Sequence, residues 1–184
     1  PKKIVIGLSG PAGAGKDTVA DYLVNSWDFE KVSFAGPLKD AVSALFGVSK
    51  HQMEDRVLKE TPIEEWGKSP RQLNQWIGTE IIRKQIDVDF FLRRMGISIG
   101  CSDRVVISDC RFDNEAQYVR EKWGGQVWRI DAPSRAQTGM SETTKQHASE
   151  KPISEHLVDK TVDNDGDIQF TFQQVDNHLI DILP

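Results

Sequence analysis

A glycine-rich segment directly after a short apolar run constrains this chain more than any other feature. Residues 4–8 are Ile-Val-Ile-Gly-Leu, and Gly10-Pro-Ala-Gly-Ala-Gly-Lys16 fits the pattern G-x-x-x-x-G-K. This order predicts a buried strand, a tight turn and the start of a helix. Glycines let several backbone N–H groups point at one centre, and the helix N-terminus adds its positive end. The segment therefore predicts a phosphate-binding loop in which Lys16 reaches the β- and γ-phosphates of a nucleotide.

Two other classes of nucleotide-binding protein share part of this pattern, and the sequence argues against both. A dinucleotide-binding fingerprint needs a third Gly or Ala where this chain has Thr18, and it has no role for a lysine. A switch GTPase needs an N-K-x-D segment and a D-x-x-G segment suitably placed after a strand, and the sequence has neither. The loop also departs from the usual ending, because Asp17 stands where Ser or Thr is expected.

Length and charge narrow the classes of partner. The 184 residues suit one α/β domain spanning residues 1–184, with 38% apolar and 28% charged residues. A net charge of −5 argues against a nucleic-acid polymer as partner, because its phosphates need a basic surface. The sequence shows no run of membrane-spanning length, no signal peptide, and too few cysteines for a disulfide framework. We therefore expect a cytoplasmic protein with no membrane partner, and a homodimer stays open.

Apolar runs alternate with helical patterns along the rest of the chain. This alternation predicts right-handed βαβ units and a three-layer α/β fold, with a mainly parallel five-stranded sheet flanked by helices. The polar stretches 49–69 and 132–155 predict a surface excursion and a lid-like loop, respectively. The expected strands cover 3–8, 31–35, 104–108, 126–130 and 157–162, and the expected helices cover 17–26, 37–46, 70–85, 87–95, 114–123 and 168–182.

The expected helix 70–85 has two chemically different sides. At about 100° per residue, one side is an apolar stripe that should pack inward. The stripe is formed by Leu73, Trp76, Ile77 and Ile81. The opposite side carries Arg71, Gln75, Gly78 and Ile82, with Thr79 beside them. A glycine within a helix usually marks a close approach by another group. Periodicity alone leaves open whether this polar side walls a ligand site or is a solvated face with a packing glycine.

Charged residues follow the expected strand 104–108. Asp109 and Arg111 come directly after it, and ligands bind beyond the carboxyl ends of the strands in such sheets. Asp109 is placed either like a carboxylate that orients Mg²⁺ or its waters, or as a turn residue. Arg111 has the planar fork that suits a phosphate.

The two residues after Lys16 carry oxygen donors. Because Asp17 would lie beside a triphosphate, we infer that it contacts hydrated Mg²⁺ or an arginine, while Thr18 supplies the hydroxyl that Ser or Thr usually provides at the end of such a loop.

Four segments, in their order and spacing, resemble the deoxynucleoside monophosphate kinases of bacteriophages. They are Gly13-Ala-Gly-Lys-Asp-Thr-Val-Ala20, Ala35-Gly-Pro-Leu-Lys-Asp40, Arg71-x-x-x-Gln-x-x-Gly-Thr79 and Ile107-Ser-Asp-Cys-Arg-x-x-x-Glu115. The resemblance covers almost the whole chain and implies a P-loop fold of the nucleoside monophosphate kinase type. It also implies that the γ-phosphoryl group of ATP moves to a deoxynucleoside 5′-monophosphate with Mg²⁺, in a phage or prophage protein of a bacterial host.

The resemblance implies roles for residues at matching positions. ATP would be held by Gly13, Ala14, Gly15, Lys16, Asp17 and Thr18, with Mg²⁺ at the last two. The monophosphate would be bound by a helical region of about residues 40–95 and by the strand end, through Lys39, Arg71, Gln75, Gly78, Thr79, Phe91, Asp109, Arg111 and Glu115. Phe91 would lie against the base, and catalysis would fall to Lys16, Asp109 and Arg111. The lid-like loop receives no residue roles.

Other functions stay open beside this one. Animal phosphomevalonate kinases share a similar G-K-D loop, a Gly-Pro-Leu-Lys segment and an S-D-x-R strand end, and dephospho-coenzyme A kinase is more distant. A non-catalytic nucleotide-binding module would usually need an interaction surface or a further domain, and the sequence shows neither. His147 and Glu150, or His156 with the cysteines, lack the paired spacing typical of a metal site.

Overall fold

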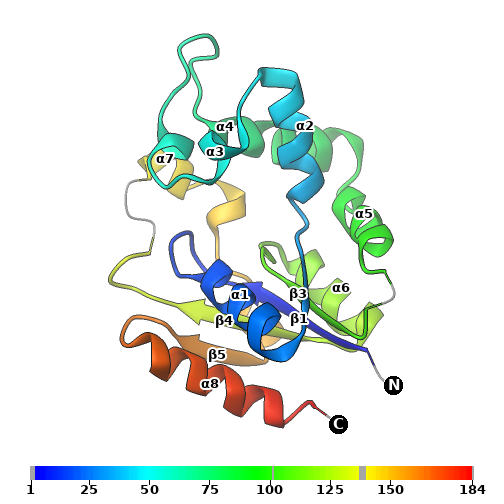
Figure 1. Cartoon of the computed structure of the whole chain (residues 1–184). Coiled ribbons are helices and arrows are strands. Elements are labelled where there is room, and N and C mark those ends of the chain that lie inside the picture. The colour runs from blue at the N-terminus through cyan, green and yellow to red at the C-terminus, as the bar shows by residue number, and fades with distance from the viewer. Residues whose placement is uncertain (1–2, 101, 137–139, 184) are drawn as a thin grey trace.

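Five parallel strands form a single sheet in the order β2-β3-β1-β4-β5 (Figure 1). The computed structural model describes residues 3–100, 102–136 and 140–183. Every neighbouring pair of strands is parallel, which confirms the expected five-stranded sheet. The strands are β1 (Ile4–Ser9), β2 (Glu30–Val32), β3 (Arg104–Ile107), β4 (Gln126–Asp131) and β5 (Lys160–Asp163).

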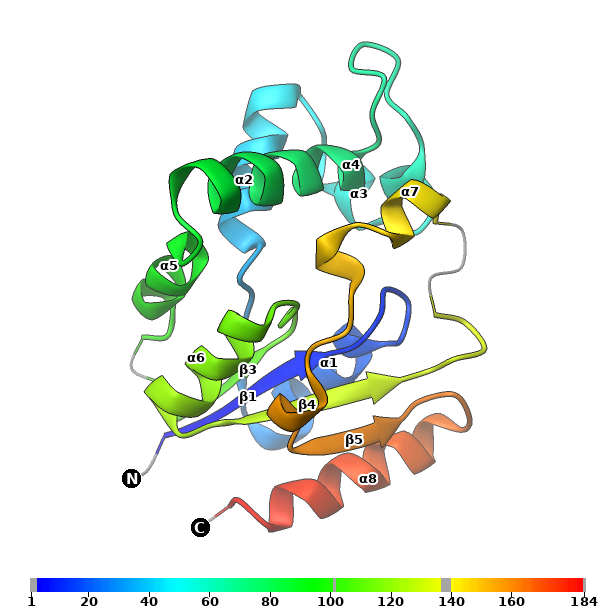
Figure 2. The same cartoon turned by 180° about the vertical axis from the view of Figure 1, so that it is seen from behind.

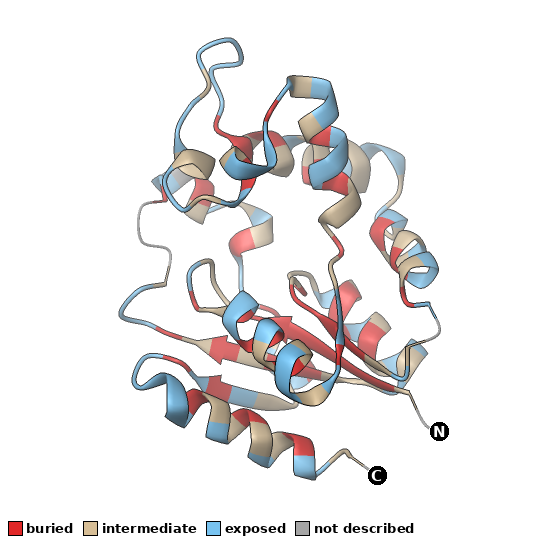
Figure 3. Ribbon diagram, in the orientation of Figure 1, coloured by how far each residue is buried: buried red, intermediate tan, exposed pale blue. Residues whose placement is uncertain are grey.

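Strand β1 lies at the centre of the sheet and leads into the glycine-rich loop. All 6 of its residues are buried, because it pairs with β3 on one side and with β4 on the other. Parallel strands covered on both faces are apolar along nearly their whole length, which explains the run Ile-Val-Ile-Gly-Leu. Figure 3 shows the same pattern, with buried residues concentrated on the strands. The loop therefore starts from the best-supported strand of the sheet.

Helices cover both faces of the sheet and complete a three-layer fold (Figures 1 and 2). On one face lie α1 (Lys16–Trp27) and α8 (Ile168–Ile180), whose Tyr22 and Phe172 rings stack with centroids 3.9 Å apart. On the other face lies α6 (Asp113–Trp123), which belongs to an apolar core distinct from the one on the face of α1 and α8. The predicted fold class is confirmed.

A second group of helices leaves the sheet after β2 and returns to it at β3. In Figure 1 this group lies above the sheet, beyond the glycine-rich loop. Two short elements of the expected lid-like loop, α7 (Glu142–Lys145) and η3 (Ala148–Glu150), lie beside it (Figure 2), and η4 (Glu155–Leu157) precedes β5. The group consists of α2 (Gly36–Phe46), α3 (Lys50–Glu54), η1 (Leu58–Glu60), α4 (Pro70–Gln75), η2 (Trp76–Ile86) and α5 (Phe90–Ser98).

The expected helix 70–85 is present but changes its pitch part-way. It begins where the Ser69 hydroxyl accepts a hydrogen bond from the Gln72 backbone N–H, and α4 then continues as the π-helix η2. A π-helix has wider turns than an α-helix, so residues spaced for a 3.6-residue period no longer share one side. The apolar stripe predicted from that period is wrong at Trp76, which is 42% exposed, although Leu73 is buried.

Smaller differences concern boundaries and functional regions. Strand β2 ends at Val32, although a strand to residue 35 was expected. Strand β5 begins at Lys160, although a strand from residue 157 was expected, and Leu157 belongs to η4 instead. The division into a monophosphate-binding region at 40–95 and a lid at 132–155 stays a prediction, and Cys101 and residues 137–139 lie outside the described residues. Across the part of the chain that the structure describes, the helices are too short or too polar to cross a membrane.

Candidate active site

The glycine-rich loop has three glycines with backbone angles that favour glycine. Gly10 has φ 129°, Gly13 has φ 82° and Gly15 has φ 95°, all in the region that L side chains rarely adopt. A Cβ atom on Gly10 would lie 2.3 Å from the Ile130 carbonyl oxygen, and one on Gly15 would lie 2.1 Å from Asn164 Nδ2. The glycine-rich loop therefore packs closely against Ile130 in β4 and against Asn164, which follows β5.

The Asn164 side chain anchors the glycine-rich loop to the segment after β5, a role that was not predicted from the sequence. Its buried side chain donates from Nδ2 to the Ala14 carbonyl oxygen at 2.8 Å, and its Oδ1 accepts from Thr171 Oγ1 at 2.9 Å. Arg135 donates a hydrogen bond to the Asn164 carbonyl oxygen. The sequence indicated only a turn at Asn164-Asp165-Gly166. Its link to the loop depends on β5 lying at the sheet edge beside β4.

The Lys16 side chain is hydrogen-bonded within the glycine-rich loop, and its predicted contact with phosphate stays a prediction. Its Nζ donates to the carbonyl oxygens of Gly10 at 2.6 Å and Pro11 at 2.9 Å. Burial lowers the pKa of Lys16 to about 7, and the positive charge of Arg111 acts in the same direction, while the negative charge of Glu150 opposes it. The charges of Arg111 and Glu150, which lie outside the loop in sequence, therefore affect the pKa of Lys16, although its own hydrogen bonds stay within the loop.

Asp17 and Thr18 both lie on the first turn of α1. The Asp17 carboxylate is 2.8 Å from Lys31 Nζ, and its side chain is 79% exposed. Partial desolvation raises the pKa of Asp17, but the hydrogen bond and charge of Lys31, together with Lys39 and Lys16, lower it overall. Thr18 is exposed. In the described residues, Asp17 is thus paired with Lys31, and not with the arginine that was one of the two partners expected from the sequence, while its contact with Mg²⁺ stays a prediction.

The Asp109 carboxylate binds the backbone of the turn that follows β2. Its Oδ1 accepts from the Phe34 N–H at 2.7 Å, and its Oδ2 accepts from the Ala35 N–H at 2.9 Å. Of the two placements considered from the sequence, the turn residue matches this geometry. Asp109 thereby fixes the start of α2, whose Lys39 was expected to face the monophosphate. A direct part for Asp109 in catalysis stays a prediction.

Asp109→Asn is expected to lower the free energy of unfolding by about 1–3 kcal/mol, because an amide has one acceptor oxygen and leaves a backbone N–H without a partner. We also expect the KM for the monophosphate to rise more than the KM for ATP, because the displaced turn leads into α2. Urea unfolding and steady-state kinetics measure both effects, with the exposed Asp103→Asn as the matched control. Loss of kcat at unchanged stability would instead favour a direct catalytic role.

Three predicted substrate-binding residues converge on one carboxylate. Glu150 Oε1 lies 3.1 Å from Arg71 Nη1, 2.9 Å from Arg111 Nη1 and 3.5 Å from Gln75 Nε2. The Glu150 side chain is only 2% exposed. Glu60 holds the other edge of the Arg71 guanidinium, with 2.6 Å between its Oε1 and Arg71 Nε. The two arginines and the glutamine thus form an anion-binding pocket, and its present occupant comes from the expected lid.

A buried ion pair between Arg83 and Glu115 lies next to this pocket. Glu115 also accepts hydrogen bonds from the backbone N–H groups of Arg111 at 2.7 Å and Phe112 at 3.1 Å. Burial raises the pKa of Glu115 to about 7, against the charge of Arg83. The Arg83 guanidinium lies 5.0 Å from the centroid of Phe91 and 4.1 Å from that of Phe112. Glu115 therefore positions Arg111, and Phe91 contacts Arg83.

The remaining predicted residues occupy two settings. Gly78 lets α2 approach closely, because a Cβ there would lie 2.5 Å from Leu38 Cδ2. Thr79 is buried beside it, whereas Lys39 is exposed. The substrate contacts of Gly78, Thr79, Lys39 and Phe91 stay predictions. The close approach matches the packing glycine left open by the periodicity.

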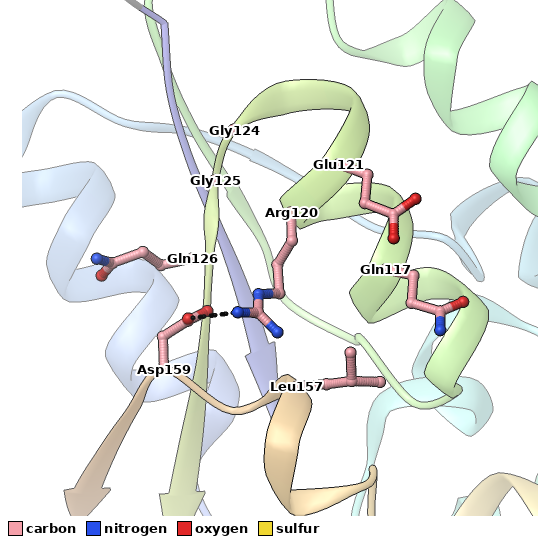
Figure 4. Close-up of a pocket in the computed structure, with 8 residues that line it drawn as sticks. All are labelled: Gln117, Arg120, Glu121, Gly124, Gly125, Gln126, Leu157 and Asp159. Carbon is pink, nitrogen blue, oxygen red and sulfur yellow. Dashed lines mark ion pairs between the residues drawn. The ribbon is translucent and has the colours of Figure 1, made fainter.

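A pocket of about 560 Å³ lies elsewhere, at the amino end of β4 (Figure 4). Its main charged groups neutralise each other, because Arg120 Nη2 lies 3.3 Å from Asp159 Oδ1, as the dashed line in the figure marks. Arg120 also donates to the His156 carbonyl oxygen at 2.9 Å. In open parallel α/β sheets, ligands bind beyond the carboxyl ends of the strands, so we assign no substrate to this pocket.

Comparison with known proteins gives this geometry a family. A family model described as "Deoxynucleotide monophosphate kinase" matches residues 51–175, more than half of the chain. The chain belongs to the deoxynucleotide monophosphate kinase family. The predicted family is therefore confirmed, and with it a kinase enzyme.

Individual relatives agree with the family model. The "Putative deoxynucleotide monophosphate kinase" of Acanthamoeba polyphaga mimivirus is 36% identical over 151 residues, which cover 72% of this chain and 76% of the viral protein. The "Deoxynucleoside-5'-monophosphate kinase" of Escherichia phage T5 is 25% identical over 64% of this chain and 72% of its own length.

Solved structures support the fold of this deoxynucleotide monophosphate kinase family member. TT1252 from Thermus thermophilus covers 100% of both chains with a TM-score of 0.54 and 19% identity. A shikimate kinase from Acinetobacter baumannii covers 100% of this chain and 96% of its own, with a TM-score of 0.51 and 12% identity. At these identities the likeness concerns the fold alone.

Proposed function

We propose that this kinase transfers the γ-phosphoryl group of ATP to a deoxynucleoside 5′-monophosphate, giving the diphosphate and ADP. The observation that carries this function is that Arg71 and Arg111 both contact one carboxylate, Glu150, and that the charges of Glu150 and Arg111 reach Lys16. An arginine fork suits a phosphate dianion. We infer that the acceptor phosphate would bind at these arginines, beside the loop that would hold ATP.

The chemistry needs positioning and charge neutralisation more than proton transfer. The acceptor oxygen of a monophosphate is already ionised near neutral pH, so no general base is required. Lys16 would bind the β- and γ-phosphates, and Arg111 and Arg71 would hold the acceptor phosphate in line with them. Glu115 would act indirectly, because it fixes the backbone of Arg111. Asp109 would also act indirectly, because it fixes the turn that leads into α2.

ATP and Mg²⁺ are the expected cofactors, and the donor set fits them. Mg²⁺ in kinases takes most of its ligands from phosphate oxygens and water, with one or two oxygen donors from the protein. The Thr18 hydroxyl and the Asp17 carboxylate, both on the first turn of α1, would be those donors. Bound Mg²⁺ would neutralise charge on the phosphate oxygens during transfer. The ion pair between Lys31 and Asp17 would be broken when Mg²⁺ is bound.

An ADP-release assay tests this function. Purified protein is supplied with ATP, Mg²⁺ and, separately, dAMP, dCMP, dGMP, dTMP, phosphomevalonate or dephospho-coenzyme A. We expect ADP release that depends on at least one deoxynucleoside monophosphate. Activity on phosphomevalonate or dephospho-coenzyme A alone would overturn the proposal. ATP hydrolysis that no acceptor stimulates, together with binding of a protein partner, would favour a nucleotide-binding module.

We propose that the enzyme works in the cytoplasm of a bacterial host, where ATP and deoxynucleotides are found. The free thiol of Cys110 is buried, which is consistent with a reducing compartment. A homodimer stays a prediction that sedimentation equilibrium would test.

A further inference from the structure

Glu150 fills the pocket that the acceptor phosphate needs. Its Oε1 accepts hydrogen bonds from both Arg71 and Arg111, at 3.1 and 2.9 Å, and lies within 3.5 Å of Gln75 Nε2. Its charge also reaches Lys16, where it opposes the effect of Arg111. A carboxylate held by two guanidinium groups has the binding geometry that a phosphate would adopt at the same place.

Electrostatics allow only one anion in this pocket at a time. Without Glu150, Arg71 would still be paired with Glu60, but Arg111 would lose the carboxylate that it shares with Arg71, and the two positive charges would lie close together with less charge to offset them, a costly arrangement away from water. Glu150 removes that cost. A phosphate dianion would remove it as well, but beside the Glu150 carboxylate it would be repelled. The two anions therefore compete for the same donors.

The segment that carries Glu150 rests on the same helices that form the pocket. Gln75 Nε2 lies 3.4 Å from Ser149 Oγ, and His147 Nε2 lies 3.4 Å from Glu80 Oε1. These contacts are polar, and the Glu150 backbone N–H is bonded locally, to the His147 carbonyl oxygen. Turning the Glu150 side chain out of the pocket therefore breaks polar contacts, while Ile153, three residues on, can keep its place in the apolar core.

We propose that Glu150 is an internal stand-in for the acceptor phosphate, which keeps Arg71 and Arg111 together in the free enzyme and is displaced when the monophosphate binds. This inference rests on the proposed function, because it names the event that opens the acceptor site. Each binding of a monophosphate then includes the release of Glu150 from the two arginines. The apparent affinity for the acceptor is lowered by the fraction of enzyme in which Glu150 occupies the pocket.

The isosteric variant Glu150→Gln tests the proposal. It keeps the shape of the side chain but removes the charge that competes with phosphate. Isothermal titration of the full chain with each of the four deoxynucleoside monophosphates, and with inorganic phosphate, should show binding at least about tenfold tighter than in the wild type. The control is Glu142→Gln, a carboxylate that is 78% exposed and paired with Lys145, for which no change is expected.

Thermal unfolding with and without inorganic phosphate provides a second readout. Because Glu150→Gln removes the carboxylate shared by Arg71 and Arg111 and leaves the Arg71–Glu60 pair, the free variant should melt below the wild type, and phosphate should stabilise the variant more than it stabilises the wild type. Weaker binding of monophosphate and phosphate by the variant, or equal stabilisation of both proteins, would overturn the proposal. Tighter phosphate binding without ADP release on any monophosphate would instead refute the proposed function while supporting the stand-in role.

Discussion

Replacing Lys16 by alanine is expected to lower kcat for phosphoryl transfer by about 10²–10³-fold and to leave the fold intact. The Lys16 ammonium lies at the centre of the loop, bonded to the Gly10 and Pro11 carbonyl oxygens. In the transition state it would neutralise charge that the ground state carries to a lesser degree, so its loss should affect kcat more than the KM for ATP. Steady-state kinetics with the best monophosphate acceptor measure the effect.

Stability should not fall with this substitution. Burial lowers the pKa of Lys16, so its charge is already disfavoured in the free protein, and alanine removes that burden. Circular dichroism melts would establish that Lys16→Ala is folded. The matched control is Lys122→Ala, an exposed lysine in the last turn of α6, which should keep wild-type kinetics. Wild-type turnover by Lys16→Ala would refute the phosphate-binding loop.

Replacing Glu115 by alanine is expected to lower the free energy of unfolding by about 3–5 kcal/mol, the range for breaking a buried ion pair by removing one partner. The variant leaves the Arg83 side chain, 8% exposed, without its counter-charge. It also removes the acceptor for the backbone N–H groups of Arg111 and Phe112. Urea unfolding measures the loss.

Two further variants separate the buried charge from other causes. Glu142→Ala removes an exposed carboxylate paired with Lys145 and should cost less than about 1 kcal/mol. The double variant Arg83→Met/Glu115→Leu removes both charges and should recover much of the stability, because apolar side chains of similar volume replace a buried pair well. A cost below 1 kcal/mol for Glu115→Ala would show that Arg83 finds water or another partner.

Local patterns were sufficient to predict the sheet and the strand, glycine-rich turn and helix start around Gly10. Each depends on residues close in sequence, such as the apolar run before Gly10. Phosphate binding by the loop stays a prediction. The pitch of η2 was not predictable in this way, because Trp76 and Ile81 fit an α-helical stripe equally well. Tertiary packing decided the outcome there.

Glu150, Asn164 and Arg83 were missed because their roles come from long-range contacts. Glu150 lies in a polar stretch typical of a solvated loop, yet it meets Arg71 from 79 residues away. Asn164 stands in a turn motif, yet it bonds to Ala14 across 150 residues. Arg83 follows the segment that resembled the phage enzymes. In each case the residue type is common, and only the folded neighbours give it a role.

The hydrogen bonds from Phe34 and Ala35 to Asp109 have a consequence for how such enzymes diverge. They join the point where the chain leaves the sheet after β2 to the point just past its return through β3, its neighbour. Residues 36–103 thus form a cassette whose two ends are fastened together, and closing such an excursion depends only weakly on its length. Insertions or deletions inside the cassette should therefore leave the glycine-rich loop in place. Exchange of the whole cassette would in addition have to keep its ion pairs with the rest of the chain, Arg83 with Glu115 and Arg71 with Glu150.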